Sequence, residues 1–176
     1  MDGDCLRLAS SDASFMSEAL VEAHLAAEAG EVPVGAVIVL NGNVISKGHN
    51  GREERQSPLA HAEILAIEEA AGFLRSWRLT GCDLYVTLEP CVMCVGAMLQ
   101  ARIRRLVFGC LDPKAGAAES LYRLCGDPRL NHRLSVTGGV SGPECATLLE
   151  NFFSALRQRK KQARIAERWP SPVEGA

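Results

Sequence analysis

Residues 84–94 read LYVTLEPCVMC, and this stretch decides the fold. Residues 84–88 form a short apolar run, which predicts a buried strand, and Pro90 follows almost directly. Proline suits the first turn of a helix because the N–H that it lacks has no partner there. We therefore expect a helix over residues 91–101 that has Cys91 and Cys94 at its start. A strand that runs straight into a helix is typical of an α/β protein.

The chain on either side continues this alternation of helices and strands. Apolar residues at helical spacing predict a helix from Ser11 to Gly30, capped by Ser11 or Asp12. The sequence Asn-Gly-Asn at 41–43 lies between two β-rich runs and predicts a hairpin. The remaining expected elements are strands at 34–40, 44–46, 105–109 and 135–138, a helix at 60–71 and a closing helix from 143 to about 168. This order predicts a three-layer α/β/α fold, with a mixed central sheet of about five strands.

Length and composition indicate a single folded domain. The chain has 176 residues, of which 47% are hydrophobic and 23% charged, as in ordinary globular proteins. Residues 1–168 are expected to form this domain, and residues 169–176, with two prolines and a glycine, a flexible tail. No apolar run approaches the ~20 residues of a membrane span, and the N-terminus has no signal-peptide pattern. These features predict a cytoplasmic protein that does not associate with membranes.

The seven cysteines fit that compartment. They lie at positions 5, 82, 91, 94, 110, 125 and 145. An odd number without a secretory signal argues against a disulfide framework and favours reduced thiols, a few of which can bind metal.

Charge is divided unequally along the chain. Residues 157–176 carry six basic and two acidic side chains, a net charge of +4, whereas the other 156 residues carry 13 basic and 19 acidic ones, a net charge of −6. This is not the surface of a general nucleic-acid binder, but the basic end can contact phosphates locally. The alternative for that end is a solvated helix face.

His61-Ala62-Glu63 and Pro90-Cys91-Val92-Met93-Cys94 carry the chemistry of the sequence. Cysteines at i and i+3 project from one side of a helix, so both can reach one metal ion. If the helix with His61 lies alongside, it adds a ring nitrogen, and one nitrogen with two sulfurs suits zinc.

The number of ligands distinguishes a structural site from a catalytic one. Structural zinc sites have four protein ligands, whereas three leave a position for water. Glu63 is placed to exchange a proton with that water and not to complete the shell, which is general acid–base work. Three alternatives remain, namely a redox Cys-x-x-Cys pair, a core histidine at His61 that binds no metal, or a structural site closed by Cys82 or Cys110.

The two motifs together resemble those of the zinc-dependent nucleobase deaminases. Further stretches, over about residues 12–165, are similar to the bacterial tRNA-specific adenosine deaminase branch of that family. These stretches are EVPVGA at 31–36, AHAEI at 60–64, residues 84–94, GAA at 116–118 and LNHR at 130–133.

The resemblance implies hydrolytic deamination of adenosine to inosine at the wobble position of a tRNA anticodon. It also implies a cytidine-deaminase-like fold and a homodimer with one zinc ion per subunit. In this resemblance Glu63 is the proton shuttle and Asn50 hydrogen-bonds the flipped base. The metal ligands are His61, Cys91 and Cys94, the apolar pocket walls are Val34 and Leu88, and the RNA contacts are Asp112, Phe152, Phe153 and Arg157.

The residues alone leave other interpretations open. Asn50 and Asp112 can be simple turn residues, and Phe152 and Phe153 can belong to the core. At the level of function, a deaminase of free nucleosides or nucleobases, or a noncatalytic zinc or RNA-binding module, competes with the tRNA enzyme. The basic end favours a polymeric substrate, and Glu63 beside a three-ligand set favours an enzyme.

Overall fold

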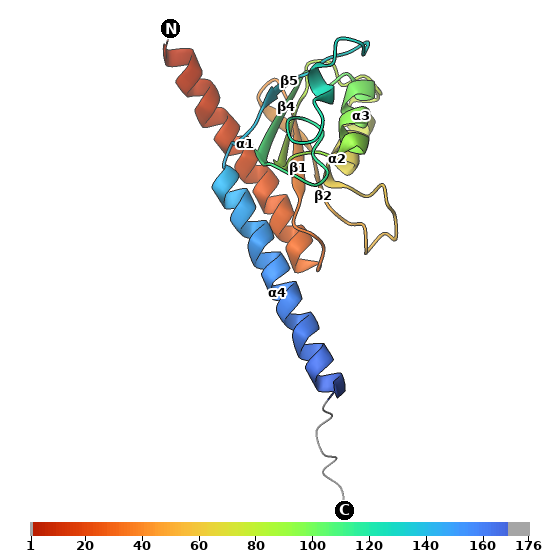
Figure 1. Ribbon diagram of the computed structural model, residues 1–176. Helices are drawn as coiled ribbons and strands as arrows, with labels where there is room; N and C mark the ends of the chain where they lie inside the picture. The colour runs from red at the N-terminus through yellow and green to blue at the C-terminus, as the bar shows by residue number, and fades with distance from the viewer. Residues whose placement is uncertain (1, 169–176) are drawn as a thin grey trace, which may run out of the picture.

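The computed structural model describes residues 2–168, with side chains described for residues 12–164, and is built around a mixed five-stranded sheet (Figure 1). The strands lie in the order β2-β1-β3-β4-β5, where β1 runs antiparallel to β2 and β3, and β4 runs parallel to β3 and β5. The expected mixed sheet is therefore confirmed. The strands are β1 (Gly35–Leu40), β2 (Asn43–His49), β3 (Asp83–Leu88), β4 (Arg105–Cys110) and β5 (Ser135–Thr137).

Helices cover both faces of this sheet, which confirms the three-layer architecture (Figure 1). On one face, α2 and α3 bury their apolar side chains against strand residues such as Ile38, Leu84 and Leu106. On the other face, α1 and the first turns of α4 pack on Val37, Tyr85 and other strand residues. The helices are α1 (Asp2–Glu28), α2 (Ala62–Leu74), α3 (Val92–Ala101) and α4 (Gly142–Arg168), with a short 3-10 helix, η1 (Leu124–Gly126).

The β1–β2 hairpin forms where the sequence predicts it. Asn41 and Gly42 have φ angles of 50° and 77°. Positive φ at both central residues is the requirement of the two-residue turn that matches the twist of paired strands, and asparagine and glycine tolerate it best. The hairpin places the end of β2 beside the start of β1, where Asn50 N–H donates to the carbonyl of Val34.

The predicted start of the first helix is wrong. Helix α1 begins at Asp2, so neither Ser11 nor Asp12 caps it. Asp12 instead lies inside the helix, where its buried carboxylate pairs with Arg105 Nη2 at 2.7 Å and accepts a hydrogen bond from Tyr85 Oη at 2.8 Å. The partners of Asp12 lie 73 and 93 residues away, so the local cap pattern could not reveal them.

Gly48 sets how closely β2 approaches α2. A Cβ atom at position 48 would lie 2.5 Å from the carbonyl oxygen of Ala62 and 2.8 Å from the amide nitrogen of Ala66. Any side chain there would therefore displace the first turns of α2. The absence of a side chain at Gly48 keeps the start of this helix beside the sheet.

The closing helix runs to Arg168, as expected, and its second half extends away from the sheet (Figure 1). Leu148 is the last residue of α4 in the apolar cluster between α1 and the sheet. Within residues 2–168, no helix has the length and apolar character that crossing a bilayer requires. The expected flexible tail, residues 169–176, lies outside the described residues.

Candidate active site

A cavity of about 230 Å³ lies where β2 and β3 end and α2 and α3 begin. Both helices point their N-termini towards it, because His61 is the N-cap residue of α2 and Cys91 the N-cap residue of α3. The residues that line it come from five separate segments of the chain. They are Val32, Val34, Asn50, Arg52, His61, Ala62, Glu63, Leu88, Glu89, Cys91, Asp112 and Ala115.

The three sequence-predicted metal ligands meet beside this cavity. His61 Nδ1 lies 3.8 Å from Cys91 Sγ and 3.5 Å from Cys94 Sγ, and the two sulfur atoms lie 3.7 Å apart. Tetrahedral zinc with Zn–S near 2.3 Å and Zn–N near 2.0 Å requires about 3.8 Å between sulfurs and about 3.6 Å between sulfur and nitrogen. The donor atoms therefore already have the spacing that a zinc ion needs.

The alternative of a closed, four-ligand site is not borne out. Within the described part of the chain, the group of potential ligand atoms that lie within 4.8 Å of one another consists of His61, Cys91 and Cys94. Cys82 is fully buried just before β3. Cys110 Sγ contacts the carbonyl of Thr87 and not the three ligand atoms. Three protein ligands leave the fourth position of a tetrahedral ion free for water.

The thiols and the imidazole influence each other's protonation. Hydrogen bonding with Cys94, together with the nearby His61 ring, lowers the pKa of Cys91 to about 3 and outweighs the opposing effect of burial. The same contact raises the pKa of Cys94, and the bond to Cys91 raises the pKa of His61. A thiolate with a low pKa is the form that binds metal.

Glu63 lies in the first turn of α2, two residues after the histidine. Its side chain is buried, only 4% exposed, yet it lines the cavity and remains outside the group of three ligand atoms. Burial raises the pKa of Glu63 above its ordinary value. A raised pKa makes a carboxylate a better proton acceptor, which suits the general base of a hydrolytic reaction.

Four other sequence-predicted residues also line the cavity. Val34 and Leu88 give it apolar wall, while Asn50 and Asp112 add polar groups. Asp112 also shapes its own loop, because its Oδ1 accepts the backbone N–H groups of Lys114 at 2.9 Å and Ala115 at 3.2 Å. Asp112 is therefore both a turn residue and a residue that lines the cavity.

Sequence reasoning missed the roles of two buried glutamates, one that lines the cavity and one that contacts Asn50. Glu89, 2% exposed, accepts hydrogen bonds from the backbone N–H groups of residues 112, 118, 119 and 120 and from the Ser120 hydroxyl. Burial alone would raise the pKa of this carboxyl group, but the hydrogen bonds outweigh burial, so the pKa of Glu89 lies below its ordinary value. Glu89 thereby holds the loop that carries Asp112.

Glu31 is also 2% exposed and contacts Asn50 and the Glu54 backbone. Glu31 lies in the stretch EVPVGA at 31–36, but nothing in that stretch indicates the contacts that it makes.

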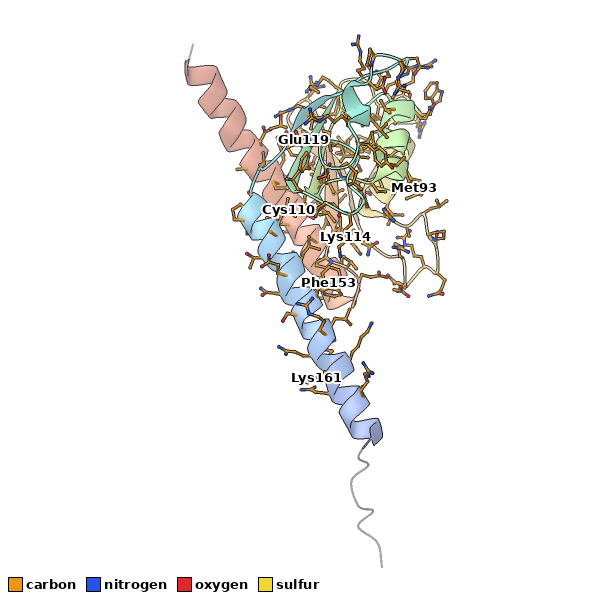
Figure 2. All side chains as sticks on the ribbon, viewed as in Figure 1. Met93, Cys110, Lys114, Glu119, Phe153 and Lys161 are labelled. Atoms are coloured by element: carbon orange, nitrogen blue, oxygen red, sulfur yellow. The ribbon has the colours of Figure 1, made fainter. Side chains whose placement is uncertain are left out.

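The three predicted contacts on the closing helix do not join the cavity. Phe152 is half-buried and Phe153 is 39% exposed, and their rings pack edge to face with centroids 5.5 Å apart. Arg157 is exposed one turn further along. Figure 2 shows Phe153 and Lys161 on the part of α4 that extends away from the sheet.

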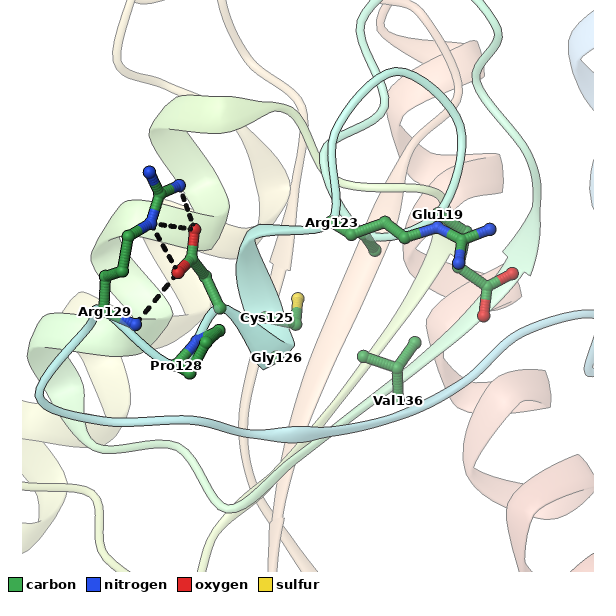
Figure 3. A pocket seen from close by; sticks show the side chains of 9 residues that line it. Glu119, Arg123, Cys125, Gly126, Pro128, Arg129 and Val136 are labelled. Carbon is green, nitrogen blue, oxygen red and sulfur yellow. Dashed lines mark hydrogen bonds and ion pairs between the residues drawn. The ribbon is translucent and has the colours of Figure 1, made fainter.

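A larger hollow of about 790 Å³ lies on another part of the surface, between η1 and β5 (Figure 3). Its charged lining residues balance, since Arg123 and Arg129 face Glu119 and Asp127. Asp127 accepts hydrogen bonds from the Arg129 guanidinium, the shortest of them 2.6 Å. Within the described residues this hollow has no cluster of metal ligands. Size alone therefore does not identify the active site.

The fold and the His/Cys/Cys site define a zinc-dependent deaminase. Residues 9–110 match the cytidine and deoxycytidylate deaminase zinc-binding region. The chain belongs to this family, and zinc is the cofactor that its donor set fits.

Similar proteins narrow the comparison within that family. The tRNA-specific adenosine deaminase of Bacillus subtilis is 50% identical over 87% of this chain and 95% of its own length. That of Aquifex aeolicus is 48% identical over 81% of this chain and 94% of its own length. A solved structure from studies of A-to-I editing by tRNA deaminases at the wobble position superposes with a TM-score of 0.75. It is 49% identical and covers 77% of this chain and 99% of the solved chain.

Proposed function

We propose that this chain hydrolytically deaminates adenosine to inosine at the wobble position of a tRNA anticodon. The observation that carries the proposal is the single cavity that brings the buried Glu63 together with the His61 and Cys91 donor atoms and the amide of Asn50. The relatives at 50% and 48% identity, named tRNA-specific adenosine deaminases, support the choice of substrate.

In this proposal His61, Cys91 and Cys94 hold the zinc ion. Zinc supplies an activated water in such sites. Glu63 takes the two protons of the attacking water in turn, and it delivers the first to the ring nitrogen and the second to the departing amine, so that adenosine and water yield inosine and ammonia. Asn50 hydrogen-bonds the base, and Val34 and Leu88 contact its faces.

The size of the cavity fits one base that has left its stack. Its volume of about 230 Å³ is smaller than the ~300–1,000 Å³ of sites for drug-sized ligands, which leaves the sugar and phosphates outside. A base must then turn outward to enter, at a cost that is smallest for unpaired bases. An anticodon loop meets that condition.

The rest of the RNA is held by one residue of the cavity lining and by residues on α4. Asp112 lies near the sugar of the target nucleotide, and Phe152, Phe153 and Arg157 contact the anticodon loop. Arg157 begins a row of exposed basic side chains on α4, with Arg159, Lys160, Lys161 and Arg164. Exposed aromatic and basic groups together suit stacking on bases and contact with phosphates.

We propose a homodimer as the working form. Val92, Leu121 and Tyr122 are large apolar residues that are about half exposed. They lie near one another, because Cys91 pairs with Gly116, and the Gly116 carbonyl accepts the N–H groups of Leu121 and Tyr122. Exposed apolar residues that gather in this way mark an interaction surface. Sedimentation equilibrium should give twice the mass of the chain, and Val92→Glu should shift it towards the monomer.

We propose that this enzyme acts in the cytoplasm on its tRNA substrate. Six of the cysteines, all in the part of the chain whose side chains are described, form no disulfide bond, which suits a reducing compartment.

The decisive experiment compares four substrates side by side. These are an anticodon stem-loop with adenosine at the wobble position, the same loop with cytidine there, free adenosine and free cytidine. Efficient inosine formation in the first loop alone is expected, because free nucleosides lack the remote contacts that position the reacting carbon. Comparable turnover of a free nucleoside, or preference for the cytidine loop, would favour the alternative deaminase. Zinc binding without any deamination would favour the noncatalytic module.

A further inference from the structure

Two neighbouring residues at the end of β2 each contact a buried glutamate. His49 Nδ1 lies 2.8 Å from Glu22 Oε2, and Asn50 Nδ2 donates to Glu31 Oε2 at 3.2 Å. Asn50 lines the active-site cavity, whereas His49 and Glu22 line a different hollow. The chain thus offers two similar contacts, only one of which faces the proposed chemistry.

Glu31 is held rigidly where α1 ends. Its backbone N–H donates to the carbonyl of Ala26 after Gly30, which turns the chain with a φ of 80°. Its carboxylate is 2% exposed, and both oxygens are used. Oε2 accepts from Asn50, and Oε1 accepts the backbone N–H of Glu54 at 2.8 Å. One side chain therefore joins the end of β2 to the loop that follows it.

These contacts fix which end of the Asn50 amide faces the cavity. The carbonyl of Val32 also accepts from Asn50 Nδ2, at 3.2 Å, so both of its hydrogens have acceptors. If the amide were turned over, its Oδ1 would face two acceptor oxygens with no hydrogen between them. The observed orientation is thus imposed chemically, and it leaves Oδ1 as the free end of the amide.

We infer that Glu31 is a positioning residue that holds the Asn50 amide with its acceptor oxygen towards the substrate. This inference rests on the proposed function, because it assigns Asn50 a substrate contact. A substrate N–H or O–H group then finds a fixed acceptor when it enters the cavity. Without Glu31 the amide can rotate, and the fraction of molecules with a correctly presented acceptor falls.

The test is a double-mutant cycle on the zinc-loaded enzyme, with Glu31→Gln, Asn50→Ala and the combination. Glutamine keeps the size of the side chain but offers one acceptor where glutamate offers two, so one of the two contacts is lost. We expect Glu31→Gln to lower kcat per bound zinc about ten- to a hundredfold, the range for a buried hydrogen bond left unmade. KM for the stem-loop should change less, because contacts outside the cavity also hold the RNA. The matched control Glu22→Gln should leave kcat within about twofold of the wild type.

Coupling between the two residues separates positioning from a general structural role. If Glu31 acts through Asn50, the combined variant should be no slower than Asn50→Ala alone. Independent effects that multiply, or a Glu31→Gln enzyme as fast as the wild type per bound zinc, would overturn the inference while leaving the proposed function intact.

If the wild type deaminates no stem-loop, the proposed function is refuted. The role of Glu31 can still be tested by a spectroscopic measurement that does not depend on activity. The side-chain NH2 resonances of Asn50, identified by their loss in Asn50→Ala, report its hydrogen bonds in the 15N-labelled protein. Glu31→Gln should shift them and Glu22→Gln should not. Unshifted resonances in Glu31→Gln would overturn the role of Glu31 on their own.

Discussion

The cavity and the second half of α4 differ in how far their side chains are buried. Around the cavity, side chains from separate segments are buried and bonded to one another, as Glu63, Glu89 and Asn50 illustrate. Along α4 from Asn151 to Arg164 the side chains are exposed or half-exposed, and the rings of Phe152 and Phe153 pack on each other. The first arrangement suits chemistry, which needs fixed geometry, and the second suits contact with a long, charged substrate.

This contrast implies that turnover and RNA binding are controlled by different residues. Substitutions at the cavity should reduce the rate of the chemical step or the metal content and leave RNA affinity nearly unchanged. Substitutions on α4 should weaken RNA binding and leave the rate at saturating RNA nearly unchanged. Each of the following experiments tests one side of this division.

The largest effect is expected at Glu63. Glu63→Gln preserves the size of the side chain but cannot take up a proton, so kcat should fall by on the order of 10²–10⁴-fold. Zinc content and RNA affinity should stay as in the wild type, measured by elemental analysis and by filter binding. Glu68→Gln, at an exposed position of the same helix, is the control. Wild-type turnover by Glu63→Gln would mean that another group moves the proton.

Loss of a metal ligand should affect both activity and stability. Cys91→Ser should lower the zinc content well below one ion per chain and reduce the melting temperature, because metal binding is coupled to folding. The wild type treated with a strong chelator should show the same loss of stability, and added zinc should restore the wild type fully. Cys110→Ser lies outside the ligand group and should retain its zinc. Full zinc occupancy in Cys91→Ser would contradict the ligand assignment.

Neutralising charge on α4 should change the salt dependence of RNA binding. Arg157 and Lys160 are exposed, and each phosphate contact contributes up to about one unit to the slope of log K against log salt. Changing both to glutamine should therefore flatten the slope by up to about two units, with kcat at saturating stem-loop unchanged. Changing Arg75 and Arg78, which lie beyond α2, provides the control with equal loss of charge. An unchanged slope would leave α4 as a solvated helix face.

The smallest effect is expected from a single aromatic ring. Phe153→Ala should weaken stem-loop binding by about 1–3 kcal/mol if the ring stacks on a base. Stability should change little, because Phe153 is 39% exposed. Phe73→Ala is the matched control, since Phe73 is 66% exposed on α2. Equal affinities for both variants would assign Phe153 to the packing of α4.

The sequence predicts well those parts of the fold that depend on local patterns. The Asn41-Gly42 turn and the strand that ends just before Pro90 are confirmed because their determinants lie within a few residues. The spacing of Cys91 and Cys94 likewise predicts two sulfur atoms on one side of a helix start, and they lie 3.7 Å apart. The meeting of His61 with them depends on the packing of two helices, and here the resemblance to a known family supplied the information.

Features that depend on residues far apart in the chain could not be predicted from the sequence. Asp12 looked like a helix cap, but it pairs with an arginine 93 residues away. Glu31 and Glu89 were overlooked because their main partners are an amide or backbone N–H groups, which leave no pattern of residue types. A buried carboxylate of this kind becomes visible only when the chain is folded and its neighbours can be counted.

Gly48 extends the constraints on this enzyme beyond the residues that touch substrate. A side chain at this position would press on the backbone of Ala62 and Ala66, in the helix that carries Glu63. In a library of random single substitutions selected for deamination, we expect position 48 to be as intolerant as the cavity itself. Efforts to evolve this chain towards new substrates can vary the cavity walls. They must retain Gly48, although this residue does not line the cavity.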